Sequence, residues 1–308
     1  MTRRAAHSLF RLLPVLLVAG AAIILAGAVF MAACGGSGTP DESTSGAPAP
    51  TVTVTVTASP SPSASPSPSA TGTTTVRAYF LRGEKLGVAE RRVPHTVAVA
   101  AAAMNMLCDG PTPAERKAGL RSAVPAGTEL RGISVKQGVA TVDLSGRFAS
   151  GGGSLSMMAR ATQVVYTLTQ FRSIKAVEFM VDGSRVESLG GEGLVLDTPQ
   201  RRADWREFEP PIFVEAPGVG AVLDDPFTLR GTAMVFEASF TAQLVDSSGR
   251  RIVRAQMQAS MGAPERGVFS DRIAYSTSAQ SGWLVVYETS MMDGSRQNVV
   301  RIPVTFGD

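Results

Sequence analysis

The feature that most constrains the fold of this chain is a long stretch with almost no residues that can build a core. From residue 35 to 74 the sequence is dominated by Ser, Thr, Pro, Ala and Gly, with four Ser-Pro steps between residues 59 and 68. Such a composition buries too little apolar surface to offset the entropy lost on folding. We therefore predict a disordered, stalk-like linker over residues 34–74, with folded structure beginning near Thr75.

The first 33 residues have the organisation of a secretory signal segment, with a basic start, an apolar centre and a small-residue end. Three arginines and no acidic residue accompany the apolar run Leu12–Phe30, which leads into Met31-Ala32-Ala33-Cys34. This ending resembles the lipobox of bacterial lipoproteins, although that family usually has Leu where this chain has Met31. The resemblance implies a signal peptide over residues 1–33 and a lipid, such as palmitate, on Cys34. It also implies anchoring on the extracytoplasmic face of the cell membrane.

An uncleaved transmembrane anchor is the alternative explanation of the same segment. Residues 12–33 have roughly enough apolar length to span a bilayer core of ~30 Å. The positive charges lie at the inner end of this segment, so both explanations place the rest of the chain outside the membrane.

The charge balance argues against a nucleic-acid partner. The full sequence has 29 Lys and Arg, 26 Asp and Glu, and a formal net charge of +3. Removing the leader, with its three arginines, leaves as many basic as acidic residues. Without a basic excess to neutralise phosphates, we expect no nucleic-acid binding.

The supply of histidine and cysteine limits the chemistry further. Of the two histidines, His7 lies in the predicted leader, which leaves His95, and of the two cysteines, Cys34 is the lipid site that the resemblance implies. One histidine without a Gly-x-Ser-x-Gly elbow does not indicate a Ser-His-Asp mechanism, and zinc needs several His or Cys ligands. Cys108 is predicted to be a buried apolar residue, with a Cys34–Cys108 disulfide as the alternative. We expect no catalytic, metal or cofactor site.

Carboxylates are the other source of acid–base chemistry. Asp224-Asp225 or Glu84 and Glu90 would act as a hydrolase pair only at a fixed separation in a cleft. We interpret Asp224-Asp225-Pro226 as a turn before a strand. Three further aspartates are placed at strand ends, where they satisfy backbone donors, and no calcium-loop motif accompanies them: Asp143, Asp182 and Asp293.

Two glycine-rich segments are interpreted as loop hinges. Gly151-Gly152-Gly153 precedes a predicted helix, where an anion would find free N–H groups, but it lacks the Gly-Lys-Ser/Thr of a phosphate-binding loop. Gly218-Val219-Gly220 has no third glycine and no helix after it.

The apolar patterns of residues 75–200 predict the order β-α-β-β-α-β. Alternation predicts strands at 76–81, 129–135, 139–144 and 174–181, with Lys136-Gln137-Gly138 turning a hairpin. Helical spacing predicts one helix capped by Thr96 and running from Val97 to Cys108, and a second along Leu155, Met158, Thr162 and Val165. We expect an α+β domain in which two helices pack on one face of a small mixed sheet.

Five segments of this region, in this order, resemble the GerMN domain: Cys108–Glu115, Gly119–Thr128, Gly138–Ser145, Gln163–Thr169 and Val181–Gly183. The resemblance implies a domain first named in spore-germination proteins and found in many extracytoplasmic bacterial lipoproteins. It is similar to the ring-building modules of envelope-spanning complexes, and no enzymatic activity is implied. Some lipoproteins of this kind are associated with sensor kinases and others with sporulation or germination machinery.

Residues 208–308 are predicted to form an all-β sandwich. Seven short strands are expected at 212–215, 227–231, 239–245, 252–258, 269–275, 283–289 and 299–305. Gly231–Ala238, Val268-Phe269, Asp293-Gly294 and Ile302-Pro303-Val304 resemble the immunoglobulin-like domain associated with GerMN proteins. In the connector before this domain, Trp205 is interpreted either as a docking anchor or, with Phe208, as packing on a neighbouring domain.

These observations favour a non-enzymatic surface lipoprotein that binds envelope proteins or scaffolds an envelope complex. Exposed sheet edges would offer docking by strand addition. A cell-wall glycan binder, with peptidoglycan as its partner, is the alternative, in which aromatic rings stack on sugars: Tyr79, Trp205, Trp283 and Tyr287. A carboxylate-dependent hydrolase is the third hypothesis.

Overall fold

The computed structural model describes residues 72–190 and 193–307, and those from 72 onward lie in one compact unit. Cys34, the predicted signal peptide and the predicted linker up to residue 71 lie outside the described residues. Among the described helices, none is long and apolar enough to cross a membrane.

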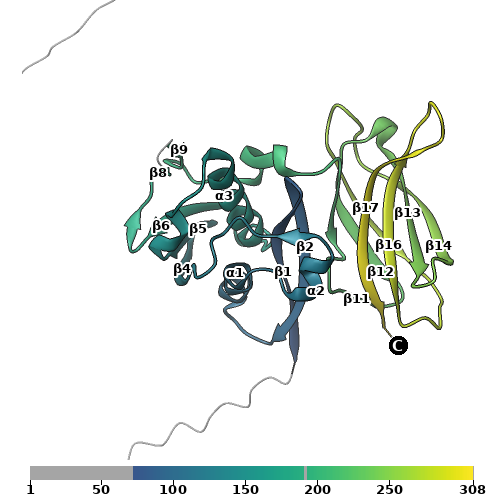
Figure 1. Cartoon of the computed structure of the whole chain (residues 1–308), viewed down its shortest axis with the longest axis horizontal. Helices are drawn as coiled ribbons and strands as arrows, with labels where there is room; N and C mark the ends of the chain where they lie inside the picture. Colours follow the sequence, from purple (N-terminus) through teal and green to yellow (C-terminus); the bar gives the residue numbers. More distant parts are fainter. Residues whose placement is uncertain (1–71, 191–192, 308) are drawn as a thin grey trace, which may run out of the picture. The chain divides into compact units, whose positions relative to one another are not determined.

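The first domain is a mixed α/β domain built on two small sheets (Figure 1). One sheet has the order β2-β1-β3, with bounds Lys85–Pro94, Thr73–Arg82 and Leu120–Arg121. The other has the order β4-β5-β6-β7, with bounds Leu130–Lys136, Val139–Leu144, Ala176–Val181 and Ser184–Arg185. In this second sheet β5 and β6 are parallel and the other pairs are antiparallel, so the sheet is mixed as expected.

Three helices complete this domain, with a small hairpin after the second sheet. The helices are α1 (Val99–Asp109), α2 (Pro113–Lys117) and α3 (Ser154–Leu168). The hairpin is formed by β8 (Ser188–Leu189) and β9 (Leu194–Val195), and a 3₁₀ turn, η1, covers Gly146–Ala149. Both α1 and α3 contact β1, and eleven of the 15 residues of α3 are buried.

The structure adds a strand that the sequence patterns did not predict. β2 pairs with β1 antiparallel from Thr73↔Pro94 to Arg82↔Lys85, so the folded chain begins two residues before the expected Thr75. The sequence KLGVAERRVP carries a glycine, three consecutive charged residues and a terminal proline, which interrupt the apolar alternation. Val88 and Ala89 are nevertheless buried, and their charged neighbours Glu90 and Arg91 form ion pairs with Arg77 and Glu115.

The start of the first helix also differs from the prediction. Helix α1 begins at Val99 with Ala98 at its N-cap, and the predicted cap, Thr96, instead accepts a hydrogen bond from the Ala98 N–H at 3.0 Å. Val97, predicted on the apolar face, is 99% exposed. Leu155, predicted on the apolar face of α3, is likewise 59% exposed, because it lies in the first turn, before the helix enters the core.

The second domain is a two-sheet sandwich that contains all seven predicted strands. One sheet has the order β10-β12-β15, with bounds Ile212–Ala216, Phe227–Ala233 and Gly267–Ile273. The other has the order β11-β17-β16-β13-β14, with bounds Val222–Leu223, Arg296–Phe306, Ser281–Thr289, Ser239–Asp246 and Arg251–Gln258. Apolar packing joins the sheets; the Phe240 and Phe269 rings, one from each sheet, lie 4.9 Å apart. Cys108 is a free cysteine and no disulfide crosses the described sandwich.

Candidate functional site

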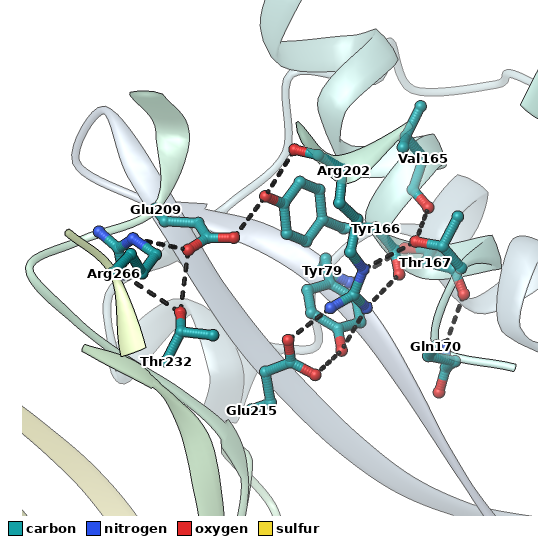
Figure 2. Close-up of polar contacts among 11 residues, drawn as sticks. Tyr79, Val165, Tyr166, Thr167, Gln170, Arg202, Glu209, Glu215, Thr232 and Arg266 are labelled. Carbon is teal, nitrogen blue, oxygen red and sulfur yellow. Dashed lines mark hydrogen bonds and ion pairs between the residues drawn. The ribbon is translucent and has the colours of Figure 1, made fainter. Parts of the chain in front are cut away.

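The most unusual feature of the described residues is a buried polar network at the junction of the two domains (Figure 2). Arg202 lies in η2 (Arg202–Phe208), the 3₁₀ segment of the connector, and its guanidinium is stacked on two rings of the first domain. The centroids of Tyr79 and Tyr166 are 5.3 and 4.7 Å from it. Its Nη1 lies 2.5 Å from Oε1 of Glu215, which belongs to β10 of the sandwich.

Tyr79 connects the same carboxylate directly to the first domain. Its hydroxyl donates to Glu215 Oε2 at 3.0 Å, and Arg202 Nη2 donates to that hydroxyl at 3.2 Å. Arg202 Nε also donates to Thr169 Oγ1 at 2.8 Å. One guanidinium thus joins β1, α3 and β10, which are far apart in the sequence.

A second carboxylate, Glu209, extends the network into the sandwich. It accepts from the Tyr166 hydroxyl at 2.6 Å and from Thr232 Oγ1 at 2.9 Å. Arg266 Nε lies 3.1 Å from Glu209 Oε2, and both side chains are at least 90% buried. Arg266 Nη2 also donates to the Pro210 carbonyl, so the arginine is held on two sides.

The network shifts the ionisation of its own members. Burial, followed by the charge of Glu215, raises the pKa of Tyr79 from 10.0 to about 12. Burial and Glu209 raise the pKa of Tyr166 well above its usual range. Burial alone would lower the pKa of Arg202, but Tyr79 and Glu215 outweigh it and raise that pKa. At neutral pH the tyrosines are therefore neutral donors and Arg202 is a fixed cation.

The segment Gly218-Val219-Gly220 makes a second, backbone contact between the domains. Val219 N–H donates to Val88 O, and Glu90 N–H donates to Val219 O, both at 2.8 Å. A Cβ on Gly220, where φ is +94°, would lie 2.7 Å from Glu90 O. The interpretation of this segment as a hinge is therefore wrong, because its glycines allow one backbone to dock closely on another.

The connector aromatics take part in packing. Trp205 and Phe208 are both buried, with their ring centroids 6.5 Å apart. Trp205 is therefore unavailable as a docking anchor for an outside partner, and the packing interpretation holds.

Beside this junction the two domains enclose a groove with a volume of about 730 Å³. Its first wall is formed by β2 and α2, where the ion pairs Arg77–Glu90 and Arg91–Glu115 neutralise the nearest charges. Its second wall is the end of the five-stranded sheet. The groove is lined mainly by apolar atoms from residues of both walls, among them Ala114, Ala118, Val219, Ala221, Trp283 and Pro303.

The structure places the predicted chemical residues in structural roles. His95 is exposed and its Nδ1 lies 3.2 Å from Thr74 Oγ1. Asp225 accepts from the Tyr275 N–H at 2.9 Å, immediately before β12, as the turn interpretation requires. Glu84 lies in the β1–β2 turn, whereas Glu90 lies in the middle of β2, opposite Arg77.

One cavity brings two of the predicted carboxylates together. Glu90 and Asp224 line a space of about 250 Å³, with Arg77 and Arg230 beside them. Glu90 is paired with Arg77 at 2.9 Å, so this cavity holds compensated charges and not a free acid–base pair. Asp143 accepts from the Gly183 N–H, Asp182 forms an ion pair with Arg131, and Asp293 accepts from the Ser295 N–H. No cluster of three metal-ligating side chains occurs among residues 72–190 and 193–307.

Cys108 and the Gly151 loop also have structural explanations. Burial, followed by the charge of Asp109, raises the pKa of the Cys108 thiol to about 11, so it is protonated at neutral pH. Arg160 donates to the carbonyls of Phe148, Ser150 and Gly151, which places a cation against the glycine-rich loop. A Cβ on Gly152 would lie 2.7 Å from Arg160 Nη2, so this glycine makes room for the arginine.

Most of the aromatic rings that were expected to stack on sugars are not accessible to a ligand. Tyr79 and Trp205 are buried, and the Tyr287 ring is covered by Arg296, whose guanidinium lies 4.3 Å from the ring centroid. Trp283 is partly exposed beneath Arg301.

The residues that sequence reasoning missed are the ones that join the domains: Arg202, Glu209, Glu215 and Arg266. For Arg202 and Glu209 the available signal was their position in the connector beside Trp205 and Phe208, whereas Glu215 and Arg266 stand in no such pattern.

Comparisons with known proteins agree with this two-domain division. Residues 77–187 match the family model Germane, described as sporulation and spore germination. Residues 211–295 match the model Gmad2, described as the immunoglobulin-like domain of bacterial spore germination. The two matches confirm both resemblances and the expected fold class, an α+β domain followed by an immunoglobulin-like sandwich. A comparison with curated proteins gives no match.

Among solved structures, two from Bacillus subtilis are similar. The first GerMN domain of the sporulation protein GerM is 22% identical, with a TM-score of 0.38, over 42% of this chain and 99% of that one. The tandem GerMN domains of GerM are 18% identical, with a TM-score of 0.38, over 66% of this chain and 62% of that one.

Proposed function

We propose that this protein, which carries a Germane (GerMN-type) domain followed by a Gmad2 immunoglobulin-like domain, is a non-enzymatic accessory lipoprotein of the cell envelope. In this proposal Cys34 holds it on the extracytoplasmic face of the membrane. The linker carries a rigid two-domain head, and the head binds or scaffolds other envelope proteins. Roles in sporulation or germination fit the family descriptions, and a sensor-kinase complex is a further class of assembly that we propose.

The proposal rests on the contacts that hold the two domains in one orientation, which we call the locked junction. A scaffold that binds through both domains works best when their relative orientation is fixed. If the domains moved freely, each binding event would have to fix that orientation and would lose conformational entropy. Here Arg202, Glu209 and the Gly218-Val219-Gly220 segment tie the domains together. The groove beside this junction is a composite surface that neither domain presents alone.

The partner role is tested by crosslinking in intact cells. A photoreactive amino acid replaces Lys117, which is exposed on the rim of the groove, and a matched position on the far side of the sandwich, Arg272, serves as control. We expect a discrete protein adduct at position 117 and none at position 272. Equal labelling at both positions, or no adduct in any growth phase, contradicts a specific protein-binding head.

The anchor is tested separately, because Cys34 lies outside the described residues. In Cys34→Ala, metabolic palmitate labelling is expected to disappear while circular dichroism and the unfolding midpoint of the purified protein stay unchanged. Palmitate retained on the variant would rule out the lipobox interpretation. A protein that keeps its membrane association without label would instead support the uncleaved helix.

A further inference from the structure

We infer that the outer face of the five-stranded sheet binds an acidic polypeptide segment of the partner, whose neighbouring apolar residues occupy the interdomain groove. This inference rests on the proposed protein-binding function and names the chemistry of the partner. We call this surface the arginine face and define it by Arg254, Arg296, Arg301, Trp283, Val285 and Tyr287.

The strand register places these side chains on one face. Arg301 is paired with Val285, Val285 with Gln243, and Gln243 with Arg254. Directly opposed residues of antiparallel strands share a face, so the four residues form one row across β17, β16, β13 and β14. The intervening core residues, such as Leu244 and Leu284, face the other sheet. Three strand spacings separate Arg301 from Arg254, or about 14 Å between their backbones.

The arginines cover an aromatic stripe along β16. The guanidinium of Arg301 lies 5.0 Å from the Trp283 ring centroid, and that of Arg296 lies 4.3 Å from the Tyr287 centroid. Val285 and Tyr287 are each only 4% exposed although they lie on the outside of the sandwich. The stripe is therefore already shielded, and the surface offers a partner exposed guanidinium groups flanking a partly exposed indole.

The positive charge of this face is not compensated within the described residues. No carboxylate there forms an ion pair with Arg254, Arg296 or Arg301. The four strands contain two acidic residues, and both are used locally. Asp246 binds Ser248 and Arg250 in its own turn, and Glu288 accepts from Phe236 N–H and the Asn298 amide.

Charge complementarity therefore requires an acidic occupant, and the geometry favours an extended polypeptide. Guanidinium groups match carboxylates in a two-pronged geometry. Arginines on both sides of the stripe can reach one extended chain lying between them, whose side chains on one face repeat about every 7 Å. A lipid surface fits less well, because the apolar side chains that would insert into it are already covered.

The groove continues this face toward the first domain. Trp283 belongs to the arginine face and also lines the groove, together with Ser281, Pro303 and Thr305 of the same two strands. A segment whose carboxylates contact the arginines would therefore place its next residues against Ala114, Ala118 and Ala221. Because this wall is apolar, those residues are expected to be apolar too.

The test measures binding of a defined peptide to the full-length protein in a non-ionic detergent. The probe is a fluorescein-labelled twelve-residue peptide, Leu-Ala-Leu-Ala followed by four Glu-Ala repeats, and the matched control has Gln in place of Glu. Fluorescence anisotropy reports binding, and the emission of Trp283 reports the site in a Trp205→Phe background. We expect the Glu peptide to bind, the Gln peptide not to bind, and affinity to fall as salt rises.

Substitutions then locate the site. Each of Arg254→Gln, Arg296→Gln and Arg301→Gln is expected to weaken binding about two- to fivefold, and the triple variant at least about tenfold. Arg272→Gln, an exposed arginine on the opposite sheet, is the control and is expected to change nothing. Ala114→Trp is expected to fill the groove and weaken the leucine-containing peptide more than an otherwise identical peptide with Ala for Leu.

Several results would overturn the inference. These are equal binding of the Glu and Gln peptides, unchanged affinity in the triple variant, or a stronger effect of Arg272→Gln. Inorganic polyphosphate and vesicles of phosphatidylglycerol and phosphatidylcholine are tested as alternative ligands. Arginine-dependent binding of either, without peptide binding, assigns the face to an anionic polymer or a membrane.

Two further design points keep the outcome decisive. If removing the arginines over the rings impairs folding, Arg254→Gln alone still tests the face, because its guanidinium covers no ring: a two- to fivefold loss of affinity for the Glu peptide supports the inference, and unchanged affinity contradicts it. The peptide assay needs neither Cys34 nor a cell envelope. Its failure is therefore distinguishable from failure of the proposed anchoring or cellular crosslinking.

Discussion

Replacing Arg202 with methionine is the sharpest test of the locked junction. The substitution keeps an unbranched apolar side chain but removes the cation that Glu215 faces at 2.5 Å. It also removes the donor to Thr169 Oγ1 and the stacking on Tyr79 and Tyr166. The arginine and Glu215 side chains are 27% and 13% exposed, so Glu215 would be left nearly buried with its charge uncompensated.

The expected loss follows from that uncompensated charge. Removing one partner of a buried ion pair costs roughly 3–5 kcal/mol, and the partial exposure of Arg202 favours the lower end. We therefore expect Arg202→Met to lower the free energy of unfolding by about 3 kcal/mol. Glu215→Gln keeps a side-chain oxygen to accept from the Tyr79 hydroxyl and is expected to cost about 2 kcal/mol. The double variant is expected to lose about 2 kcal/mol less than the sum of the single losses, because neither charge then remains unpaired.

Urea unfolding measures these losses, and the two tryptophans report on different parts of the chain. Trp205 lies in the connector against the first domain and Trp283 lies in the sandwich. Trp283→Phe and Trp205→Phe backgrounds therefore isolate each reporter. The two signals are expected to coincide with Arg202 present and to separate in Arg202→Met, as the domains lose their coupling. Additive single losses together with coincident transitions in every variant would refute the reasoning.

Three further predictions concern other parts of the molecule. Gly220→Ala is expected to lower the free energy of unfolding by about 2 kcal/mol, because the added Cβ would contact Glu90 O. Gly249→Ala is the control, with a similar positive φ but open space around it, and is expected to lower that free energy by about 1 kcal/mol. Equal losses measured by urea unfolding would contradict the argument from close approach. Burial and Glu215 raise the pKa of Tyr79 from 10.0 to about 12, so its stabilising contribution is complete below pH 10 and is lost as the pH rises toward 12. In Tyr79→Phe the free energy of unfolding should therefore fall by about 3 kcal/mol less between pH 10 and pH 12 than in the wild type. If stability measured by circular dichroism falls equally in both proteins, Tyr79 is not the group responsible. Cys108, with its pKa raised to about 11, is expected to react with an aromatic disulfide reagent at pH 8 about a hundredfold more slowly in the native protein than in urea, and equal rates would show an accessible thiolate.

The local patterns predicted much of the fold because they are set by spacing along the chain. Several sandwich strands show apolar alternation, as in Phe240, Ala242 and Leu244, and each of the seven was found within a few residues of its expected bounds. The hairpin around Gln137 and Gly138 was recognisable because a glycine separates two alternating runs, and both residues take the positive φ that this turn requires. β2 escaped recognition because ion pairs with other segments, and not alternation, support its charged end.

The site was not predictable in the same way, since its contacts join segments far apart in sequence. Tyr79 meets Glu215 across 136 positions, and no local pattern indicates that pairing. The same holds for Gly220, whose role depends on which backbone lies opposite. In the sequence, Gly220 was noticed only as part of a glycine-rich loop, and Glu215 only as the last residue of a predicted strand.

The sequence alone determined the division into leader signature, linker composition and two foldable regions, because composition and periodicity decide which segments can bury a core. It also determined that basic and acidic residues after position 33 are equal in number. Only the tertiary structure decided how those charges are distributed. The strand register places Arg301 and Arg254 on one face of the sheet. The carboxylates of Glu209, Glu215 and Asp246 form ion pairs within the protein. A chain balanced in composition therefore presents a basic surface, because pairing across strands and domains, and not order along the chain, selects which charges remain free.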